Sequence, residues 1–411
     1  MSDALPRPLD GITVVDLTIA LAGPYATQLL AALGATVIKV ENPAGGDPSR
    51  NNAPYFGSGG LKLAREDDDA MSLSMLERGR NKLSVTLNLK HEDGRAVFAD
   101  LARTADVLVE NFSSGTTDRL GIGWEWAHEL NERLVYTSIS GFGADEPGKG
   151  MDTIFQALSG VMRMSGGAGD PPVRSGVPVG DLTGPLFAVI GTLSALLLRE
   201  RTGLGQRVDV SLLGSLTSMA ATEPWGTMER AGIEMRTGNT VPRLAPFGIF
   251  ATRDGHVALC APTEAFARGV FAAMGRPELG EDERFSARDR RVLHARALHA
   301  EIEAWAAERG NGDVVAALEA AGVPVAVVRG PDDAVRDERI VRRGETVPLA
   351  HPTLGPIDEL VGSGLPIRYS AASAGYERPA PALGEHNEFV YCGLLGYESA
   401  RLAELRAAGA V

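Results

Sequence analysis

The N-terminal part of the chain alternates short runs of β-branched residues with a longer apolar segment. Residues 11–17 and 35–41 are rich in valine, isoleucine and threonine and predict two strands, while residues 20–33 predict a helix between them. Pro24 near the beginning of this helix and Gly34 after its end are typical boundary residues. A strand, a helix and a strand in this order predict a parallel, Rossmann-like sheet that is covered by helices.

The alternation continues through the first half of the chain. Strands are predicted over residues 82–89, 105–111, 134–140 and 206–212, and helices over residues 92–103 and 213–221. In open parallel sheets, ligands bind beyond the carboxyl ends of the strands. The loops at residues 20–23, 111–115 and 141–150 are therefore candidate ligand loops.

The pattern changes after residue 222. Residues 223–339 hold two predicted strands, 248–252 and 256–260, which a turn at Gly255 would join in a hairpin, together with helices rich in alanine, arginine and glutamate. Residues 340–411 are rich in proline and glycine. We predict a large α/β domain over residues 1–222, a smaller α+β domain over residues 223–339, and a return of residues 340–411 to the large domain.

Composition and charge narrow the class of protein. With 44% hydrophobic and 23% charged residues, the 411-residue chain has the composition of a soluble globular protein. Its formal net charge of −13 argues against nucleic acid as a partner, but it leaves room for a small phosphorylated ligand in a local basic pocket. The two cysteines, Cys260 and Cys392, have neither disulfide-framework nor metal-ligand spacing, so we predict no metal site.

The N-terminus and one apolar run bear on location. The first residues have no apolar signal core, which predicts a cytoplasmic protein. Residues 182–198 are uncharged, but the run is short for a membrane span and contains Pro185 and Gly191. We therefore predict a buried core helix here and no membrane association.

Asp181 is the single acid in a stretch of small and apolar residues, 173–185. Gly176, Gly180 and Gly184 recur every four residues around it, and the apolar run follows. This pattern predicts a turn at Asp181 just ahead of a helix. Taken alone, the residue is best interpreted as a helix cap or turn residue, because aspartate side chains accept backbone N–H bonds at such positions.

Several short motifs follow one another in a fixed order, and together they change this interpretation. They include Val14-Val-Asp-Leu17, Ala22-Gly-Pro24, Val37-Ile-Lys-Val-Glu41, Val109-Glu-Asn-Phe112, Gly141-Phe-Gly143 and Gly384-Glu-His-Asn387. Each motif is unspecific, but their order and spacing resemble those of the class III coenzyme A transferases, the family of formyl-CoA transferase and carnitine CoA-transferase. The likeness covers residues 9–220, is weak in the small domain and returns near the C-terminus.

The resemblance implies an architecture and a reaction. Members of this family have a Rossmann-like large domain and a small domain in a ring-shaped chain, and two such chains interlock in a homodimer. The implied activity moves coenzyme A from an acyl-CoA donor to a small carboxylic acid acceptor, with coenzyme A as a substrate and no permanently bound cofactor. Asp181 falls at the catalytic aspartate of the family, which would carry an aspartyl anhydride and then an aspartyl-CoA thioester. A nucleophilic carboxylate must be ionised, so we expect its pKa to stay well below neutral, helped by the helix dipole.

The resemblance also implies contacts with coenzyme A. The matching positions are Ala20, Leu21, Ala22, Leu87, Lys90, Asn111, Phe112, Arg119 and Lys149. Lysine and arginine are the expected partners of phosphate oxygens. The alternative interpretation is ordinary packing at the beginning of a helix for residues 20–22, and a solvated surface charge for each single cation.

Two departures from formyl-CoA transferase bear on the substrate. Asn42 stands where that enzyme has an arginine after the strand-end glutamate, and Arg50 is a candidate replacement. Leu21 stands where it has a glutamine close to the acyl group, which argues against a formyl or oxalyl substrate.

Two other functions remain as alternatives. The related α-methylacyl-CoA racemases use a histidine in a Gly-His-Asp segment, but this chain has Met151 there, which cannot take a proton. The second alternative is a homologue that binds coenzyme A without catalysis, against which the intact Asp181 counts.

Overall fold

The computed structural model describes residues 5–411 of the chain, which form two compact units. The first unit contains the chain up to Ser159, then Ser175–Met219 and Val335–Val411, and the second contains Gly160–Arg174 and Ala220–Ala334. Gly160–Arg174 thus belongs to the second unit although it precedes residue 222 in the sequence. The domain limits given above stay a prediction.

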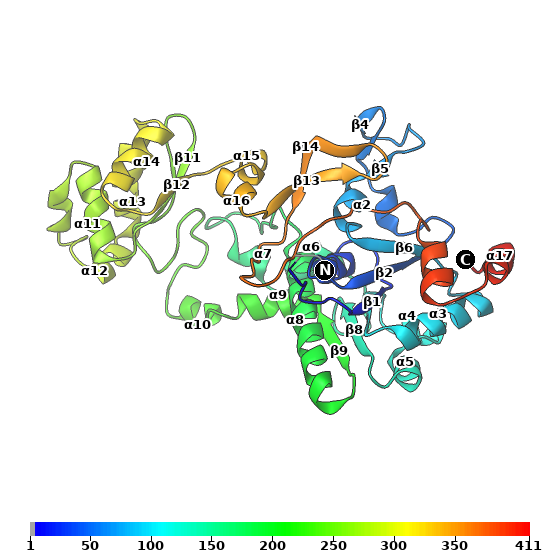
Figure 1. The fold of residues 1–411 in the computed structure, drawn as a ribbon. Helices are drawn as coiled ribbons and strands as arrows, with labels where there is room; N and C mark the ends of the chain where they lie inside the picture. Colours follow the sequence, from blue (N-terminus) through cyan, green and yellow to red (C-terminus); the bar gives the residue numbers. More distant parts are fainter. Residues whose placement is uncertain (1–4) are drawn as a thin grey trace. The chain divides into compact units, whose positions relative to one another are not determined.

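The first unit is built on a parallel sheet of six strands in the order β6-β2-β1-β7-β8-β9 (Figure 1). The strands are β1 (Thr13–Asp16), β2 (Thr36–Glu41), β6 (Lys82–Thr86), β7 (Val107–Glu110), β8 (Val135–Ser140) and β9 (Arg207–Ser211). All six lie where the sequence predicts strands, and the predicted parallel α/β sheet is confirmed. The strand order reverses between β1 and β7, and ligands bind at such switch points in open α/β sheets.

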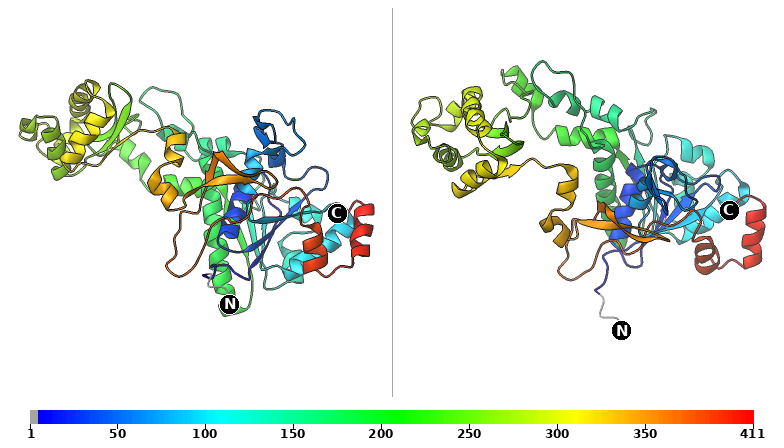
Figure 2. Two further views of the ribbon diagram at one scale, coloured as in Figure 1. Left: turned by 45° about the horizontal axis from the view of Figure 1, so that its top comes forward. Right: turned by 90° about the horizontal axis from the view of Figure 1, so that it is seen from above.

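Helices cover both faces of this sheet because the side chains of each strand point alternately to its two sides (Figures 1 and 2). Val14 packs with α1 (Ala22–Ala32) and α8 (Val179–Thr202) in one core, whereas its neighbour Val15 packs with α3 (Glu92–Thr104) in another. Burial on both faces explains why these strands are continuous apolar runs in the sequence.

Shorter elements complete the first unit. Its other helices are α2 (Leu73–Arg78), α4 (Thr116–Leu120), α5 (Trp124–Leu130), α6 (Asp152–Leu158), α9 (Leu212–Ala220), α16 (Glu338–Arg342) and α17 (Ser399–Ala407). Two small antiparallel sheets pair β3 (Tyr55–Gly57) with β4 (Gly60–Lys62) and β5 (Met71–Ser72), and β13 (Thr346–His351) with β14 (Gly355–Ser363). The sequence did not predict these two sheets, because most of their strands are short and lie in segments rich in glycine, proline and charge.

The second unit has its own sheet and core. Its three strands are β10 (Phe247–Ala251), β11 (His256–Cys260) and β12 (Val325–Val327). Its helices are α7 (Val161–Met164), α10 (Trp225–Arg230), α11 (Glu264–Ala273), α12 (Arg288–Leu293), α13 (Ala295–Ala307) and α14 (Asn311–Ala320), and α15 (Pro331–Val335) follows at its end. The predicted hairpin is confirmed: β10 and β11 pair antiparallel, and the N–H of Thr252 donates to the Gly255 carbonyl.

Arg236 explains why Gly160–Arg174 belongs to the second unit. Its guanidinium donates to the carbonyl oxygens of Ser165, Asp170 and Pro171, at 2.6–3.2 Å. One side chain therefore holds three carbonyl groups of this segment against the rest of the unit.

The C-terminal segment returns to the first unit and runs beside β6, at the edge of the main sheet. The N–H of His386 donates to the Ser84 carbonyl at 2.9 Å, and the side-chain amide of Asn387 accepts from the Thr86 N–H at 2.8 Å and donates to its hydroxyl at 2.8 Å. These bonds satisfy backbone groups that an open edge would leave exposed. The Gly384-Glu-His-Asn387 motif thus has a packing role in this fold.

Helix α8 departs from the prediction of a buried core helix. It is long and apolar enough to cross a membrane by length and composition, and 39% of its most apolar window is buried. One face packs on the sheet, but Leu186, Phe187, Ile190 and Leu197 on the rest of the helix are exposed. A large apolar surface of this kind marks a contact face rather than a solvent face.

Candidate active site

A cavity of about 270 Å³ lies at the switch point of the main sheet. The loops that follow β1, β7 and β8 line it, as the sequence predicts for ligand loops, together with Asp181 at the beginning of α8. The cavity brings together seven of the predicted site residues, namely Ala20, Leu21, Ala22, Asn111, Phe112, Lys149 and Asp181.

The loop after β1 is fixed through its backbone. The Asn111 side chain accepts from the Ile19 N–H at 2.8 Å and donates to the Ile19 carbonyl at 2.9 Å. An oxygen of Asp47 accepts from the Ala20 N–H at 3.1 Å. Ala20 has a φ of 66°, a left-handed conformation that costs a non-glycine residue roughly 1–2 kcal/mol. The two side chains therefore hold the loop in a conformation that it would not adopt freely.

Buried charges lie beneath this loop. The Lys39 ammonium donates to the Thr18 carbonyl and pairs with Asp47, both at 2.8 Å, and Lys82 pairs with Asp16 at 3.0 Å. Burial raises the pKa of Asp16, but the charges of Lys82 and Lys39 and the bonds to Thr18 outweigh it and lower the pKa to about 2. Burial lowers the pKa of Lys82 to about 8. Asp16 and Lys39 belong to the motifs quoted above, but neither these two residues nor Lys82 and Asp47 were predicted to have a role.

Asp181 lies in the first turn of α8, because the helix begins at Val179. The prediction of a turn ahead of the helix is therefore wrong. Pro178 occupies the N-cap position and no side chain caps the helix there, so the interpretation of Asp181 as a cap is also wrong. Among the described residues, no side chain or backbone group donates a hydrogen bond to the Asp181 carboxylate, which faces the cavity.

Asp152 takes the place of a cap at the beginning of α8. One oxygen of its carboxylate accepts from the N–H groups of Gly180 at 2.8 Å and Asp181 at 3.4 Å. The other oxygen accepts from the side-chain amide of Gln156 at 2.6 Å, and the Gln156 oxygen accepts from the Ser175 N–H at 2.8 Å. Asp152 and Gln156 stand four residues apart on α6, and they position the backbone of Asp181.

This positioning pair was not predicted from the sequence. Asp152 was noted only as the residue after Met151, and Gln156 only as the first residue of a family motif, Gln156-Ala-Leu-Ser-Gly160. The available signal was the spacing of an acid and an amide four residues apart, which places both on one face of a helix.

The pKa of Asp181 corrects a further expectation. Burial of the carboxylate raises it most, the negative charge of Asp152 raises it further and the cation of Arg78 opposes both, with a result of about 6. The expectation of a pKa well below neutral is wrong, because burial and the charge of Asp152 outweigh the cation of Arg78. The N–H groups of Gly180 and Asp181 donate to Asp152 and not to the Asp181 carboxylate. A pKa of about 6 still leaves roughly nine carboxyl groups in ten ionised at pH 7.

A family model described as CoA-transferase family III matches residues 9–387. The chain belongs to CoA-transferase family III. It is 34% identical to succinyl-CoA--D-citramalate CoA-transferase of Chloroflexus aurantiacus over 98% of both chains. It is 36% identical to acetyl-CoA:oxalate CoA-transferase of Acetobacter aceti, over 92% of this chain and 93% of that protein.

A solved structure supports the same assignment. The crystal structure of a CAIB/BAIF family protein from Brucella suis matches 95% of this chain and all of that chain, with a TM-score of 0.81 and 31% identity. The resemblance read from the sequence motifs is thus confirmed, and so is the activity that it implies. The chain is an enzyme that transfers coenzyme A between an acyl-CoA and an acid.

Three of the positions predicted to contact coenzyme A in this CoA-transferase do not line the cavity. Leu87 is buried in the core and its N–H donates to the Glu41 carbonyl at 2.7 Å. Lys90 is exposed on the loop after β6, and Arg119 is exposed on α4, where it donates to the Thr116 hydroxyl at 2.8 Å.

Arg50 does not replace the arginine missing at Asn42. Its guanidinium forms two hydrogen bonds of 2.7 Å with the Glu41 carboxylate, and only 9% of the residue is exposed. Its charge is therefore already paired with that of Glu41 inside the fold.

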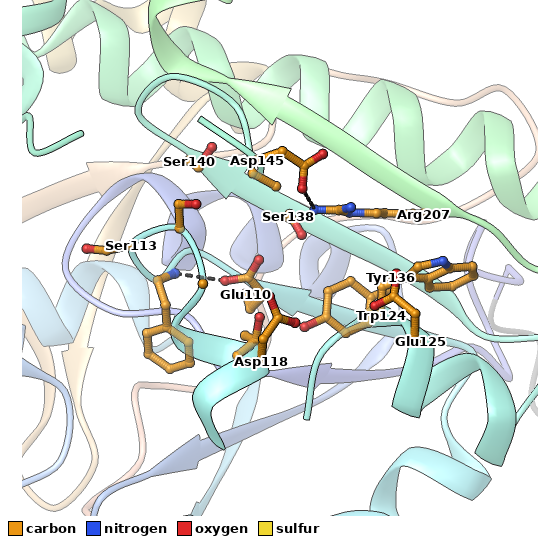
Figure 3. Close-up of a pocket in the computed structure, with 15 residues that line it drawn as sticks. Glu110, Ser113, Asp118, Trp124, Glu125, Tyr136, Ser138, Ser140, Asp145 and Arg207 are labelled. Carbon is orange, nitrogen blue, oxygen red and sulfur yellow. Dashed lines mark hydrogen bonds and ion pairs between the residues drawn. The ribbon is translucent and has the colours of Figure 1, made fainter. Parts of the chain in front are cut away.

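A second, smaller pocket of about 90 Å³ adjoins the same loops of the CoA-transferase (Figure 3). Glu110 at the end of β7 is 6% exposed, and burial raises its pKa. One of its oxygens accepts from the Phe112 N–H at 2.8 Å, and its carboxyl group also bonds with Ser138. On the far side of the pocket, Arg207 pairs with Asp145 at 3.1 Å.

Within residues 5–411, no group of three or more histidine, cysteine or acidic residues could hold a metal ion.

Proposed function

We propose that this CoA-transferase works through a covalent intermediate on Asp181. The observation that carries the proposal is the state of this carboxylate at the switch-point cavity. Its backbone is held by Asp152, and its oxygens accept no hydrogen bond from the described residues. A carboxylate that is mostly ionised at neutral pH and free of partners can attack a thioester.

The reaction consists of four acyl transfers. A carboxylate oxygen of Asp181 attacks the thioester carbonyl carbon, and the C–S bond breaks to give a mixed anhydride and the coenzyme A thiolate. The thiolate attacks the aspartyl carbonyl, which releases the donor acid and leaves an aspartyl-CoA thioester. The acceptor carboxylate then attacks this thioester, and the thiolate that it expels attacks the acceptor carbonyl of the new anhydride. The products are the acceptor acyl-CoA and free Asp181, with no water consumed.

We place coenzyme A along the loops that follow β1, β6 and β7. Residues 20–22, Asn111 and Phe112 would contact it beside the cavity, and Lys149 would reach its phosphates from the loop after β8. The exposed cations Lys90 and Arg119 would complete the set, and Leu87, which is buried in the core, would support the loop that carries Lys90. The order of the strands supports this placement, because it puts the loops after β1 and β7 at the switch point of a Rossmann-like sheet.

The acceptor is proposed to be a small carboxylic acid. The relatives described above are named for D-citramalate and oxalate, which are both dicarboxylic acids. A racemase-like activity is a weaker candidate, because Met151 is 79% exposed and offers no base beside Asp152. Binding without catalysis is disfavoured by the free carboxylate of Asp181.

We further propose a cytoplasmic homodimer in which two ring-shaped chains interlock. The exposed apolar residues of α8 support a protein contact, since a soluble monomer rarely leaves such a surface open to water. Sedimentation should show a dimer at micromolar concentration, and a stable folded monomer would contradict this part of the proposal.

The covalent step is tested by trapping. Wild-type protein incubated with an acyl-CoA and then with hydroxylamine should carry a hydroxamate on the peptide that contains Asp181, detected by mass spectrometry. Asp181→Asn should fold, bind coenzyme A and show no such label. Asp289→Asn changes an exposed acid of the second unit and should be labelled like the wild type. A label on any other residue, with Asp181 unmodified, would contradict the proposed mechanism.

A further inference from the structure

The loop after β8 forms one wall of the cavity that holds Asp181. Five of its residues line the cavity, and all five are also exposed to solvent, namely Glu146, Gly148, Lys149, Gly150 and Met151. Asp181 lines the same cavity from the beginning of α8. A segment with the cavity on one side and water on the other separates the two, so the path of this loop affects how much water reaches Asp181.

Both ends of this loop are fixed. The N–H of Ala144 donates to both carboxylate oxygens of Asp209, at 3.0 and 3.1 Å. Asp145 pairs with Arg207 at 3.1 Å (Figure 3). At the other end, the carbonyl of Met151 accepts from an N–H of α6 at 2.8 Å. The loop is therefore tied to β9 of the main sheet on one side and on the other to α6, the helix that carries Asp152.

The middle of the loop, residues 146–150, is held by few polar contacts, and we call this segment the flap. The N–H of Glu146 donates to the Gly143 carbonyl at 3.1 Å, which is a turn within the loop itself. Among the described residues, the flap forms no other hydrogen bond and no ion pair, either with its main chain or with its side chains. A segment with so few bonds opens at a low free-energy cost.

The flap lies directly on two aromatic rings. A Cβ atom at Gly148 would lie 2.5 Å from two carbon atoms of the Phe142 ring, and one at Gly150 would lie 2.6 Å from two carbon atoms of the Phe155 ring. Cβ atoms do not come this close to other atoms, so glycine is needed for the main chain to approach the rings. The two rings meet edge to face with centroids 5.6 Å apart, and Phe155 is buried in the core. The rings thus form a fixed surface beneath a segment that has few polar contacts.

The proposed reaction requires that water be kept away from Asp181. If water attacks the mixed anhydride, a C–O bond of the anhydride breaks and gives two carboxylates, the donor acid and free Asp181. Two protons are released, and the coenzyme A thiolate takes up one of them. The net result is hydrolysis of the acyl-CoA, which loses the activated acyl group. Since the same cavity must also admit an acyl-CoA and an acid, it has to open as well as to exclude water.

We propose that the flap opens to admit the substrates and closes on Phe142 and Phe155 to keep water from the acyl intermediates on Asp181. Phe142 is a positioning residue in this proposal, because it acts through the flap that it supports. Lys149 lies on the flap, so a coenzyme A phosphate bound to its ammonium favours the closed state, and closure follows substrate binding. This inference rests on the proposed covalent step at Asp181.

The test measures how the acyl group is divided between water and an acid. Acetyl-CoA, succinyl-CoA and butyryl-CoA are each mixed with their own isotopically labelled acid, and the one that exchanges label fastest is used. Transfer is this exchange rate, and hydrolysis is the release of free coenzyme A without added acid. Phe142→Ala removes the ring beneath Gly148, and Gly148→Ala places a methyl group against that ring. Each change should raise the ratio of hydrolysis to transfer roughly tenfold or more, because water then reaches the intermediates.

Matched variants separate the flap from folding. A partly unfolded protein loses both activities together, so the ratio stays unchanged. Phe266→Ala removes a half-buried ring of the second unit, and Gly312→Ala adds a Cβ atom there with no other atom within 4 Å. Both controls should keep the wild-type ratio. Phe142→Leu keeps an apolar side chain beneath the flap, so its ratio should lie between those of wild type and Phe142→Ala, and it replaces Phe142→Ala if that protein does not fold.

An unchanged ratio in the Phe142 and Gly148 variants would overturn the inference, and so would an equal rise in the two controls. The covalent step is judged by a different result. Asp181→Asn added to Phe142→Ala should abolish the extra hydrolysis, because no acyl intermediate then forms. If the extra hydrolysis persists, water attacks the thioester directly, and this result would support the flap but contradict the intermediate on Asp181.

Discussion

Two carboxyl groups near the carboxyl end of the main sheet have raised pKa values for the same first reason, which is burial, but their surroundings differ. Glu110 lies in the small acidic pocket and is bonded to the Phe112 N–H and Ser138. Asp181 lies in the larger cavity, where its backbone N–H is bonded and its carboxylate is not. The carboxylate of Glu110 is thus bonded within the fold, whereas that of Asp181 accepts no hydrogen bond from the described residues.

The comparison shows that a raised pKa does not identify a nucleophile by itself. A search for perturbed acids would select both groups, because burial raises the pKa of each. What separates them is hydrogen-bond satisfaction and access, since a carboxylate whose oxygens are bonded to backbone and hydroxyl groups has lost much of its nucleophilicity.

The largest expected effect comes from replacing each acid by its amide. Asp181→Asn should lower kcat at least roughly 1000-fold, the scale of losing a covalent nucleophile. Glu110→Gln keeps an oxygen for the Phe112 N–H and should change kcat by no more than about threefold. Steady-state transfer assays on both purified proteins check this, with circular dichroism as the folding control. Similar losses of kcat in the two variants would contradict the expected difference between Asp181 and Glu110.

The next effect concerns α4, which borders the acidic pocket. Arg119 follows Asp118 on this helix and is exposed, with one bond to Thr116. If it binds a phosphate of coenzyme A, Arg119→Ala should weaken coenzyme A by about 1–3 kcal/mol, the range for a charge-assisted bond. Calorimetry measures this, and Arg103→Ala is the matched control. An unchanged affinity would limit the coenzyme A site to the larger cavity.

The smallest effect is a shift along the pH axis. In the proposed mechanism, transfer requires ionised Asp181, so kcat/KM should rise with pH through an acidic limb near 6, where the carboxyl group loses its proton. The charge of Asp152 raises this pKa, so Asp152→Asn should move the limb to lower pH while its amide oxygen still accepts from the Gly180 N–H. Glu110→Gln should leave the limb where it is. A limb that moves in the Glu110 variant and not in the Asp152 variant would reverse the assignment.

The parallel sheet and the loops that line the cavity were predictable because both follow from short stretches of sequence. Each strand of the main sheet is a run rich in β-branched residues, and the loops after the carboxyl ends of β1, β7 and β8 line the cavity. The elements that were missed have weak local patterns: β13 and β14 are held by pairing with each other, and α2 is only six residues long.

The electrostatics of the site was less predictable than its location. The sequence singled out Asp181, which lines the cavity, but it could not show that α8 begins at Val179 or that Asp152 accepts from the N–H groups of Gly180 and Asp181. Burial and the charge of Asp152 raise the pKa of Asp181, and the contact that brings Asp152 to this place joins residues 29 positions apart. The effect of Arg78 on the pKa of Asp181 could not be predicted either, because Arg78 lies on α2, far from Asp181 in the sequence.

The support of the loop after β1 has a consequence for how such an enzyme diversifies. The bonds from Asn111 and Asp47 reach only main-chain N–H and carbonyl groups, which every residue type except proline provides. Mutations at Leu21 can therefore change what the side chain offers to a substrate without disturbing the path of the chain. Substrate preference can drift at such positions over evolutionary time, or be altered in a library, while Asn111 and Asp47 stay under selection to keep the loop in place.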